Sequence, residues 1–346
     1  MRIALIGLGM VADTHLAAIQ HSRKGLSLAG VMGRDTQRTQ AYSDKATRAL
    51  GYRVPAFSTI NEIAEDRSID FVIIATPPDA RTDLVSVLAG AGKPILMEKP
   101  VERTLAAAEE IVRICRQANV PLGVVFQHRA RAASFAMKQA LDCGVLGQIS
   151  TVEIRVPWWR DQAYYDAPGR GLYARDGGGV MINQAIHTLD LALWLLGPIT
   201  QIQSLMRTTS LHQLEAEDWA GALFEMSNGA VGSLMATTAA FPGGAESLRV
   251  QGDKAAARLE SGVLTITHLD GRIETSGTEA STGGGADPMA FTHEWHQTII
   301  EDFASSLANN SEPIASGSSS LAAHRVIDAM ERANRSGQRT EVFHAS

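Results

Sequence analysis

The first third of the chain alternates short apolar runs with amphipathic stretches long enough to be helices. The apolar runs lie at residues 3–6, 28–32, 71–75, 94–97 and 121–125. Strands covered on both faces have this composition, and such strands run parallel with helices as their crossovers. The pattern therefore predicts a doubly wound parallel α/β domain over residues 1–122.

The remaining residues, 123–346, carry longer β-type runs, at 148–156, 199–207, 219–226, 230–238 and 248–251. Ser227-Asn228-Gly229 joins two of these runs, and Asn-Gly between strands is a strong hairpin signal. Helical patterns cover 130–142 and 180–196, and the Gly-, Ser- and Thr-rich stretch 276–287 indicates a loop. We expect a second, α+β domain with an open, mostly antiparallel sheet.

Composition narrows the function classes. A chain of 346 residues with 45% hydrophobic residues has enough material for two cores. A net charge of -6 argues against a nucleic-acid partner or an anionic membrane. No apolar run approaches the roughly 20 residues of a membrane span, and no signal peptide is recognised, so we expect a cytoplasmic protein. Cys115 and Cys143 fall in helical patterns and are interpreted as buried structural thiols.

The motif Gly7-Leu8-Gly9-Met10-Val11-Ala12 follows the first predicted strand directly. In a G-x-G-x-x-A turn, the first glycine permits the tight turn and the second lets a pyrophosphate approach the backbone. The alanine permits close packing, and the helix N-terminus offers amide groups to the phosphates. The context of strand, turn and helix predicts a dinucleotide site of the Rossmann type. The alternative is a glycine turn that serves packing alone.

The end of the second strand indicates which dinucleotide binds. An acidic residue there usually binds the adenosine ribose, but this chain has Gly33, followed by Arg34 and Asp35. Without the carboxylate, and with an adjacent guanidinium, a 2′-phosphate is tolerated, which favours NADP. NAD remains the alternative, with Asp35 on the ribose.

Two further segments stand at carboxyl ends of parallel strands, the edge where ligands of open α/β sheets bind. They are Thr76-Pro77 and Glu98-Lys99. The candidate cofactor-binding residues are Gly7, Leu8, Gly9, Met10, Val11, Gly33, Arg34, Thr76, Pro77, Glu98 and Lys99.

The helical pattern at 180–196 is almost wholly apolar, yet it places Asn183, His187 and Asp190 on one stripe. Burying such groups is costly unless each has a partner. They are therefore either part of a substrate site or a hydrogen-bonded ladder that fixes the helix, mostly through Asp190. The preceding Gly177-Gly178-Gly179 lets a ligand or another backbone approach the start of the helix.

The segment from Trp158 to Tyr165 gathers aromatic rings around one guanidinium, and such a surface suits a sugar ring. An aromatic mini-core with surface tips is the alternative. The candidate substrate-binding residues are Asn183, Arg129, Trp159, Arg160, Tyr164 and Tyr165.

The order of Gly7-Leu8-Gly9, Glu98-Lys99-Pro100, Gly177-Gly178-Gly179 and the pair Asn183 and His187 resembles the Gfo/Idh/MocA oxidoreductases, over nearly the whole chain. The resemblance implies a Rossmann domain, a second domain whose open sheet often mediates oligomerisation, and hydride transfer between a nicotinamide and a ring carbon of a sugar or cyclic polyol. It also implies that Lys99 and His187 lie near the reacting hydroxyl.

Three positions depart from the family pattern. Asn183 stands where many members have Asp, Arg81 where His is frequent, and Gly33 where an acid is usual. An NAD-assisted glycoside hydrolase and a non-catalytic sugar or dinucleotide sensor remain alternative functions. No metal is expected, since His293 to His296 lack the i, i+4 histidine pair of a zinc helix.

Overall fold

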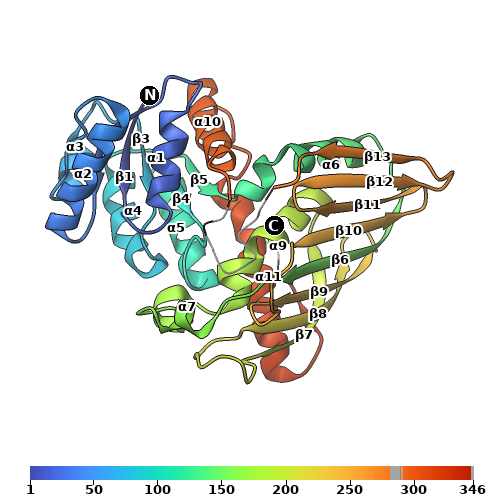
Figure 1. Cartoon of the computed structure of the whole chain (residues 1–346). Coiled ribbons are helices and arrows are strands. Elements are labelled where there is room, and N and C mark those ends of the chain that lie inside the picture. The colour runs from blue at the N-terminus through green and yellow to red at the C-terminus, as the bar shows by residue number, and fades with distance from the viewer. Residues whose placement is uncertain (281–288, 290, 344–346) are drawn as a thin grey trace. The chain divides into compact units, whose positions relative to one another are not determined.

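The protein, seen here as a computed structural model that describes residues 1–280, 289 and 291–343, forms two compact units (Figure 1). The first unit comprises Met1–Glu102, Ala106–Gln127 and Thr292–Ser320. The second comprises Arg103–Leu105, His128–Phe291 and Leu321–Ser346. The boundaries expected from the sequence are continuous, whereas the chain returns to the first unit near its end.

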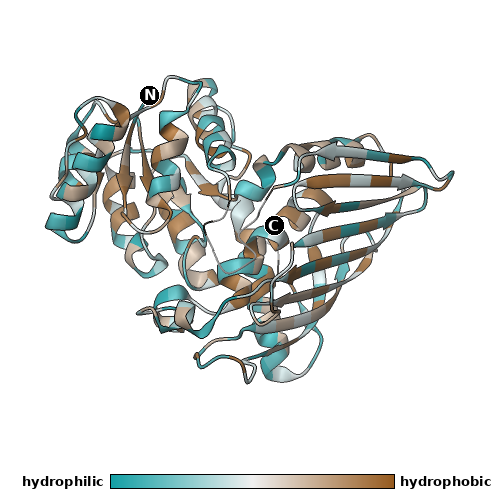
Figure 2. Ribbon diagram, viewed as in Figure 1, coloured by the Kyte–Doolittle hydropathy of each residue, from teal (hydrophilic) through white to brown (hydrophobic). Residues whose placement is uncertain are grey.

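Within the described residues, the first unit has a five-stranded sheet in the order β2-β1-β3-β4-β5, and every pair is parallel. Its strands are β1 (Arg2–Ile6), β2 (Ser27–Met32), β3 (Phe71–Ile74), β4 (Ile95–Glu98) and β5 (Leu122–Val125). Its helices are α1 (Ala12–Gln20), α2 (Thr36–Leu50), α3 (Ile60–Glu65), α4 (Arg81–Gly90), α5 (Leu105–Gln117) and α10 (Glu294–Asn309). The strands are apolar along their length (Figure 2), which confirms the predicted doubly wound sheet.

Helix α10 explains why the first unit is discontinuous in sequence. It packs against α1, and its Phe303 ring meets the ring of Phe71 edge to face, 5.3 Å between centroids. Gly123 on β5 leaves room for Phe303, because a Cβ there would lie 2.7 Å from the ring.

The sheet of the second unit has the order β13-β12-β11-β10-β6-β9-β8-β7-β14 and is antiparallel except between β6 and β9. Its strands are β6 (Ile149–Pro157), β7 (Ile199–Arg207), β8 (Trp219–Met226), β9 (Val231–Thr237), β10 (Ser247–Gly252), β11 (Ala255–Glu260), β12 (Val263–His268), β13 (Ile273–Gly277) and β14 (Thr340–Glu341). The predicted hairpin at Asn228-Gly229 joins β8 to β9 and is confirmed. One face packs against helices, and the other exposes apolar side chains such as Leu223 and Val231, 68% and 50% exposed.

The remaining helices are α6 (Ala132–Asp142), α7 (Gln162–Asp166), α8 (Tyr173–Asp176), α9 (Ile186–Leu196) and α11 (Gly317–Ser336), with a π-helical turn at Met181–Ala185. Within the described residues, one stretch, Tyr173–Leu196, is long and apolar enough to cross a membrane by length and composition alone. However, 83% of its most apolar window is buried inside the protein, as in a core helix.

Two details differ from the sequence analysis. Cys115 is buried in α5, but Cys143 is exposed where α6 ends, so the prediction of two buried thiols was wrong for Cys143. The predicted loop at 276–287 begins with the last two residues of β13, and its residues 281–287 lie outside the described part of the chain.

Candidate active site

The turn after β1 fits a dinucleotide pyrophosphate. Gly7 has φ +97°, and a Cβ there would lie 2.5 Å from the backbone of Ala75, so only glycine is accommodated. Gly9 has no atom within 4 Å of the position of its absent Cβ, which leaves open space in front of the backbone. Helix α1 starts next to it with no side-chain cap on its amide groups. The buried hydroxyl of Thr76 has no hydrogen-bond partner among the described residues, so it can form a hydrogen bond with a polar group of a ligand.

At the end of β2, Asp35 is engaged in local structure. Its Oδ1 accepts a hydrogen bond of 2.8 Å from the backbone amide of Arg38, so Asp35 is the N-cap of α2. Gly33 faces Thr39, whose Oγ1 would lie 2.9 Å from an added Cβ. Arg34 is exposed. A ribose at this strand end therefore meets a glycine and a guanidinium, with the nearest carboxylate already bonded.

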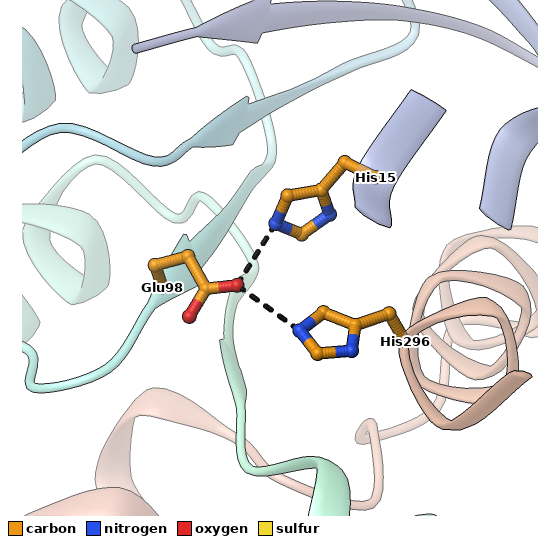
Figure 3. Close-up of side chains that lie close together, drawn as sticks. All are labelled: His15, Glu98 and His296. Carbon is orange, nitrogen blue, oxygen red and sulfur yellow. Dashed lines mark hydrogen bonds and ion pairs between the residues drawn. The ribbon is translucent and has the colours of Figure 1, made fainter. Parts of the chain in front are cut away.

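Glu98 ends β4 and its carboxylate is buried, bonded on Oε1 by two imidazoles (Figure 3). His15 Nε2 lies 2.8 Å from this oxygen and His296 Nε2 lies 3.4 Å from it. Burial alone would raise the pKa of Glu98, but the hydrogen bonds from His15 and His296 hold it well below its usual value. Glu98, predicted to contact the cofactor, is thus occupied by protein groups, while Lys99 follows it and is half-buried.

Arg81 connects the two strand ends that the sequence singled out. Its guanidinium is fully buried and donates to the backbone oxygen of Thr76, with Nη2 at 2.7 Å, and to the backbone oxygens of Glu98 and Pro100. Burial lowers the pKa of Arg81 to about 10, which still leaves it charged at neutral pH. Arg81, at the position where the resemblance leads to the expectation of a histidine, thus fastens the Thr76 and Glu98 backbones together.

In the second unit, the π-helical turn and α9 carry the polar stripe. Asn183 donates from Nδ2 to the carbonyl of Gly178 at 2.8 Å. His187 stacks on His128, with ring centroids 4.9 Å apart and planes at 26°. Asp190 is buried and forms a two-pronged ion pair with Arg129, at 2.8 and 2.6 Å.

For Asp190, the pair with Arg129 agrees with the alternative offered in the sequence analysis, in which the polar residues of this helix form hydrogen bonds that fix the helix. Burial raises the pKa of Asp190, and the guanidinium beside it opposes that shift. Arg129, predicted to contact substrate, thus holds α9 through Asp190, and its contact with substrate stays a prediction.

The aromatic segment is partly core and partly surface. Trp158, Arg160 and Tyr165 are buried, and the Arg160 guanidinium lies 5.5 Å from the centroids of both the Trp158 and the Tyr164 rings. Trp159 and Tyr164 are half-exposed. The segment is thus an aromatic mini-core with two accessible rings, and a role for these rings in binding a sugar stays a prediction.

Sequence reasoning assigned no role to two residues that support these groups. His128 has no signal beyond its type, because its contact with His187 joins distant segments. Glu217 accepts hydrogen bonds from the amides of Gly179 at 3.2 Å and Met181 at 3.0 Å, and so caps the π-helical turn. Lys99 lies in the first unit, and Asn183 and His187 lie in the second.

Comparison with known proteins agrees with this geometry. A sequence model described as an oxidoreductase family with an NAD-binding Rossmann fold matches residues 1–126, and a Gfo/Idh/MocA C-terminal domain matches 135–258. The chain belongs to the Gfo/Idh/MocA family. It is thus an oxidoreductase with a nicotinamide-dinucleotide-binding first domain, as the motifs predicted.

Family members resemble the chain over nearly its whole length. D-apiose dehydrogenase of Rhizobium rhizogenes is 26% identical, with 98% of this chain and 96% of the relative covered. Inositol 2-dehydrogenase of Rhizobium meliloti is 25% identical, with 96% of each covered. The solved WlbA dehydrogenase of Bordetella pertussis, in complex with NADH and UDP-GlcNAcA, is 28% identical with a TM-score of 0.81, covering 100% of this chain and 99% of that one.

Proposed function

We propose that the protein transfers a hydride between a nicotinamide dinucleotide and a hydroxyl-bearing ring carbon of a sugar, sugar derivative or cyclic polyol. The observation that carries this proposal is the Gly7 to Ala12 turn, which fits a pyrophosphate, in a chain that also presents Lys99 at a strand end and His187 on a buried helix. The printed names of its relatives, apiose and inositol dehydrogenases, point to the same substrate class.

The chain's own groups supply proton handling and orientation, and the bound nicotinamide supplies the hydride acceptor or donor. The Lys99 ammonium would stabilise the alkoxide that develops on the substrate. A neutral His187 imidazole would take the hydroxyl proton, unless Lys99 is itself the base. Asn183 would orient the reacting hydroxyl, while Trp159 and Tyr164 would cover an apolar face of the ring above the buried Arg160 and Tyr165.

The proposed cofactor is NADP, with NAD as the alternative. Support comes from Gly33, which offers no carboxylate, and from Asp35, whose side chain caps α2. Arg34 would pair with the 2′-phosphate. A cytoplasmic location stays a prediction of the sequence.

A substrate screen tests the function. Binding is first screened by thermal shift, with sugars, inositols, sugar acids and nucleotide sugars, each in the presence of NADP or NAD. For every ligand that binds, the reduction of the nicotinamide is then measured by its absorbance. Net nicotinamide reduction by a polyol or sugar is the expected result. Glycoside cleavage without net redox would instead identify an NAD-assisted hydrolase. Tight sugar binding with neither reaction would identify a sensor.

A further inference from the structure

The buried cluster of His15, Glu98 and His296 draws three segments of the first unit together (Figure 3). His15 lies on α1, Glu98 ends β4, and His296 lies on α10, far away in sequence. The three residues are 0%, 7% and 1% exposed, and the two imidazoles meet edge to face, 5.3 Å between centroids. Both point Nε2 at the same carboxylate oxygen. Three ligand-type atoms this close also raise the question of a metal ion.

The protonation of His15 favours a hydrogen-bonded cluster over a metal site. Its Nδ1 is buried and has no hydrogen-bond partner among the described residues. An imidazole that binds a metal through Nε2 carries its proton on Nδ1, and that proton normally needs an acceptor. An imidazolium has the same need. The form that fits is the neutral imidazole with its proton on Nε2, donated to Glu98.

Glu98 is thus held at two places. Its carboxylate accepts from α1 and α10, and its backbone oxygen accepts from the buried Arg81 on α4. Arg81 carries the nearby positive charge, and Glu102 lies close enough to Arg81 to influence its charge. Burying an ionised carboxylate is costly unless donors compensate it, and the two imidazoles are those donors.

We propose that His15 and His296 are positioning residues for Lys99: through Glu98 they fix the end of β4, the strand end that Lys99 directly follows. The proposal rests on the proposed function, in which Lys99 acts at the reacting hydroxyl. Removing the imidazole donors leaves the buried carboxylate without compensation, so the end of β4, and Lys99 after it, loses its fixed position.

The first experiment reads Lys99 directly and needs no substrate. The rate at which an amine-acylating reagent modifies Lys99 is followed against pH by peptide mass spectrometry in wild type, His15→Leu and His296→Leu. We expect the pH profile of Lys99 modification to shift in both leucine variants, with a rate near neutral pH at least about threefold higher, because a side chain released from its fixed position is more accessible and has a different environment. His15→Gln and His296→Gln keep an amide donor and should resemble wild type, as should His21→Leu, which changes an exposed histidine near the end of the same α1. A Lys99 profile that is the same in all variants overturns the proposal.

The second experiment uses a substrate that wild type oxidises. The leucine variants should lose at least about tenfold in kcat because Lys99 is misplaced. Their dissociation constant for the nicotinamide should stay within about twofold of wild type, and the glutamine variants should recover most of kcat.

A lower Tm with unchanged kcat would mean a purely structural cluster. A shifted Lys99 profile together with wild-type turnover in Lys99→Ala would support the positioning of Lys99 by His15 and His296. It would refute the proposed role of Lys99 in the reaction. Purification with one equivalent of a transition metal per chain, lost in His15→Leu, would assign the cluster to a metal and overturn the proposal.

Discussion

Arg34 is the charged side chain that the end of β2 offers to a ribose, since Asp35 is bonded to the amide of Arg38. Arg34→Ala should therefore weaken NADPH binding about tenfold, or about 1.4 kcal/mol, and leave NADH binding unchanged. Energy transfer from tryptophan to the nicotinamide measures both affinities. Arg67→Ala, which removes an exposed guanidinium elsewhere on the first unit, is the control. Equal loss for the two dinucleotides, or tighter binding of NADH by wild type, would refute the NADP assignment.

Gly33→Asp is the complementary change and should move the preference toward NAD. The structure shows why it should be made together with Thr39→Ala: a Cβ at position 33 would lie 2.9 Å from Thr39 Oγ1, which itself donates to the backbone of Asp35 at 2.7 Å. The affinity ratio for NADH over NADPH, compared with that of Thr39→Ala alone, reports the effect of the added carboxylate.

Lys99 and His187 should each be needed for turnover. Lys99→Ala and His187→Ala are expected to lower kcat by roughly 10² to 10⁴-fold, the range for proton-transferring groups, while the dissociation constant of the nicotinamide changes little. A residual rate in Lys99→Ala close to that of wild type would show that the family resemblance misplaces the site. If His187→Ala lowers the melting temperature and both affinities together, His187 is a packing residue stacked on His128 instead.

How much of the site can be predicted depends on how far apart in the sequence the interacting residues lie. The Gly7 turn and the strand-end Lys99 are predictable because they depend on local motifs next to recognisable strands. The contact of His15 and His296 with Glu98 escapes detection because it depends on α10 packing on α1, which no local spacing records. Asp190 stands out in the sequence as a charge on an apolar helix, and in the structure it pairs with Arg129.

At the scale of elements, the π-helical turn before α9 depends on Glu217. Burial raises the pKa of this carboxyl to about 7, against the hydrogen bonds it accepts from Gly179 and Met181. Since the folded state holds the proton up to a higher pH than the unfolded state does, Glu217 lowers stability as pH rises from about 4.5 to about 7, and the loss then levels off. Glu217→Gln should therefore gain stability relative to wild type between pH 5 and pH 8, by up to about 3 kcal/mol. Denaturant midpoints at both pH values measure it, and a constant difference would contradict the assignment.

The strands show which elements a sequence reveals. All five strands of the first sheet were predicted to within a residue at each end, because burial on both faces leaves a continuous apolar run. Strands β11 to β13 were not predicted. Ala255–Glu260 has the composition of a helix, and Ile273–Gly277 is exposed at every position, so no alternating pattern marks it.

At the scale of the whole molecule, the exposed face of the second sheet predicts assembly. Leu223 on β8 and Val231 on β9 lie on this face next to β6, where Glu153 pairs with Arg249 of β10, and a second copy that covers the face in a symmetric contact would bury them. Leu223→Arg should shift the protein toward monomers in light scattering, while Leu269→Arg, at an exposed turn, should not. A wild-type monomer at micromolar concentration would refute the prediction.

The return of the chain to its first unit has a consequence for synthesis on the ribosome. All five strands of the first sheet emerge before α10 is translated. Until α10 docks, the surface formed by Phe71 and Gly123, which Phe303 covers in the folded protein, stays exposed to solvent. A domain cut after Gln127 would keep that apolar surface open permanently and would lack His296 beside Glu98. The first unit is therefore synthesised first but completes its folding only when residues 292–320 have been made. Until then, its exposed apolar surface is a binding site for chaperones.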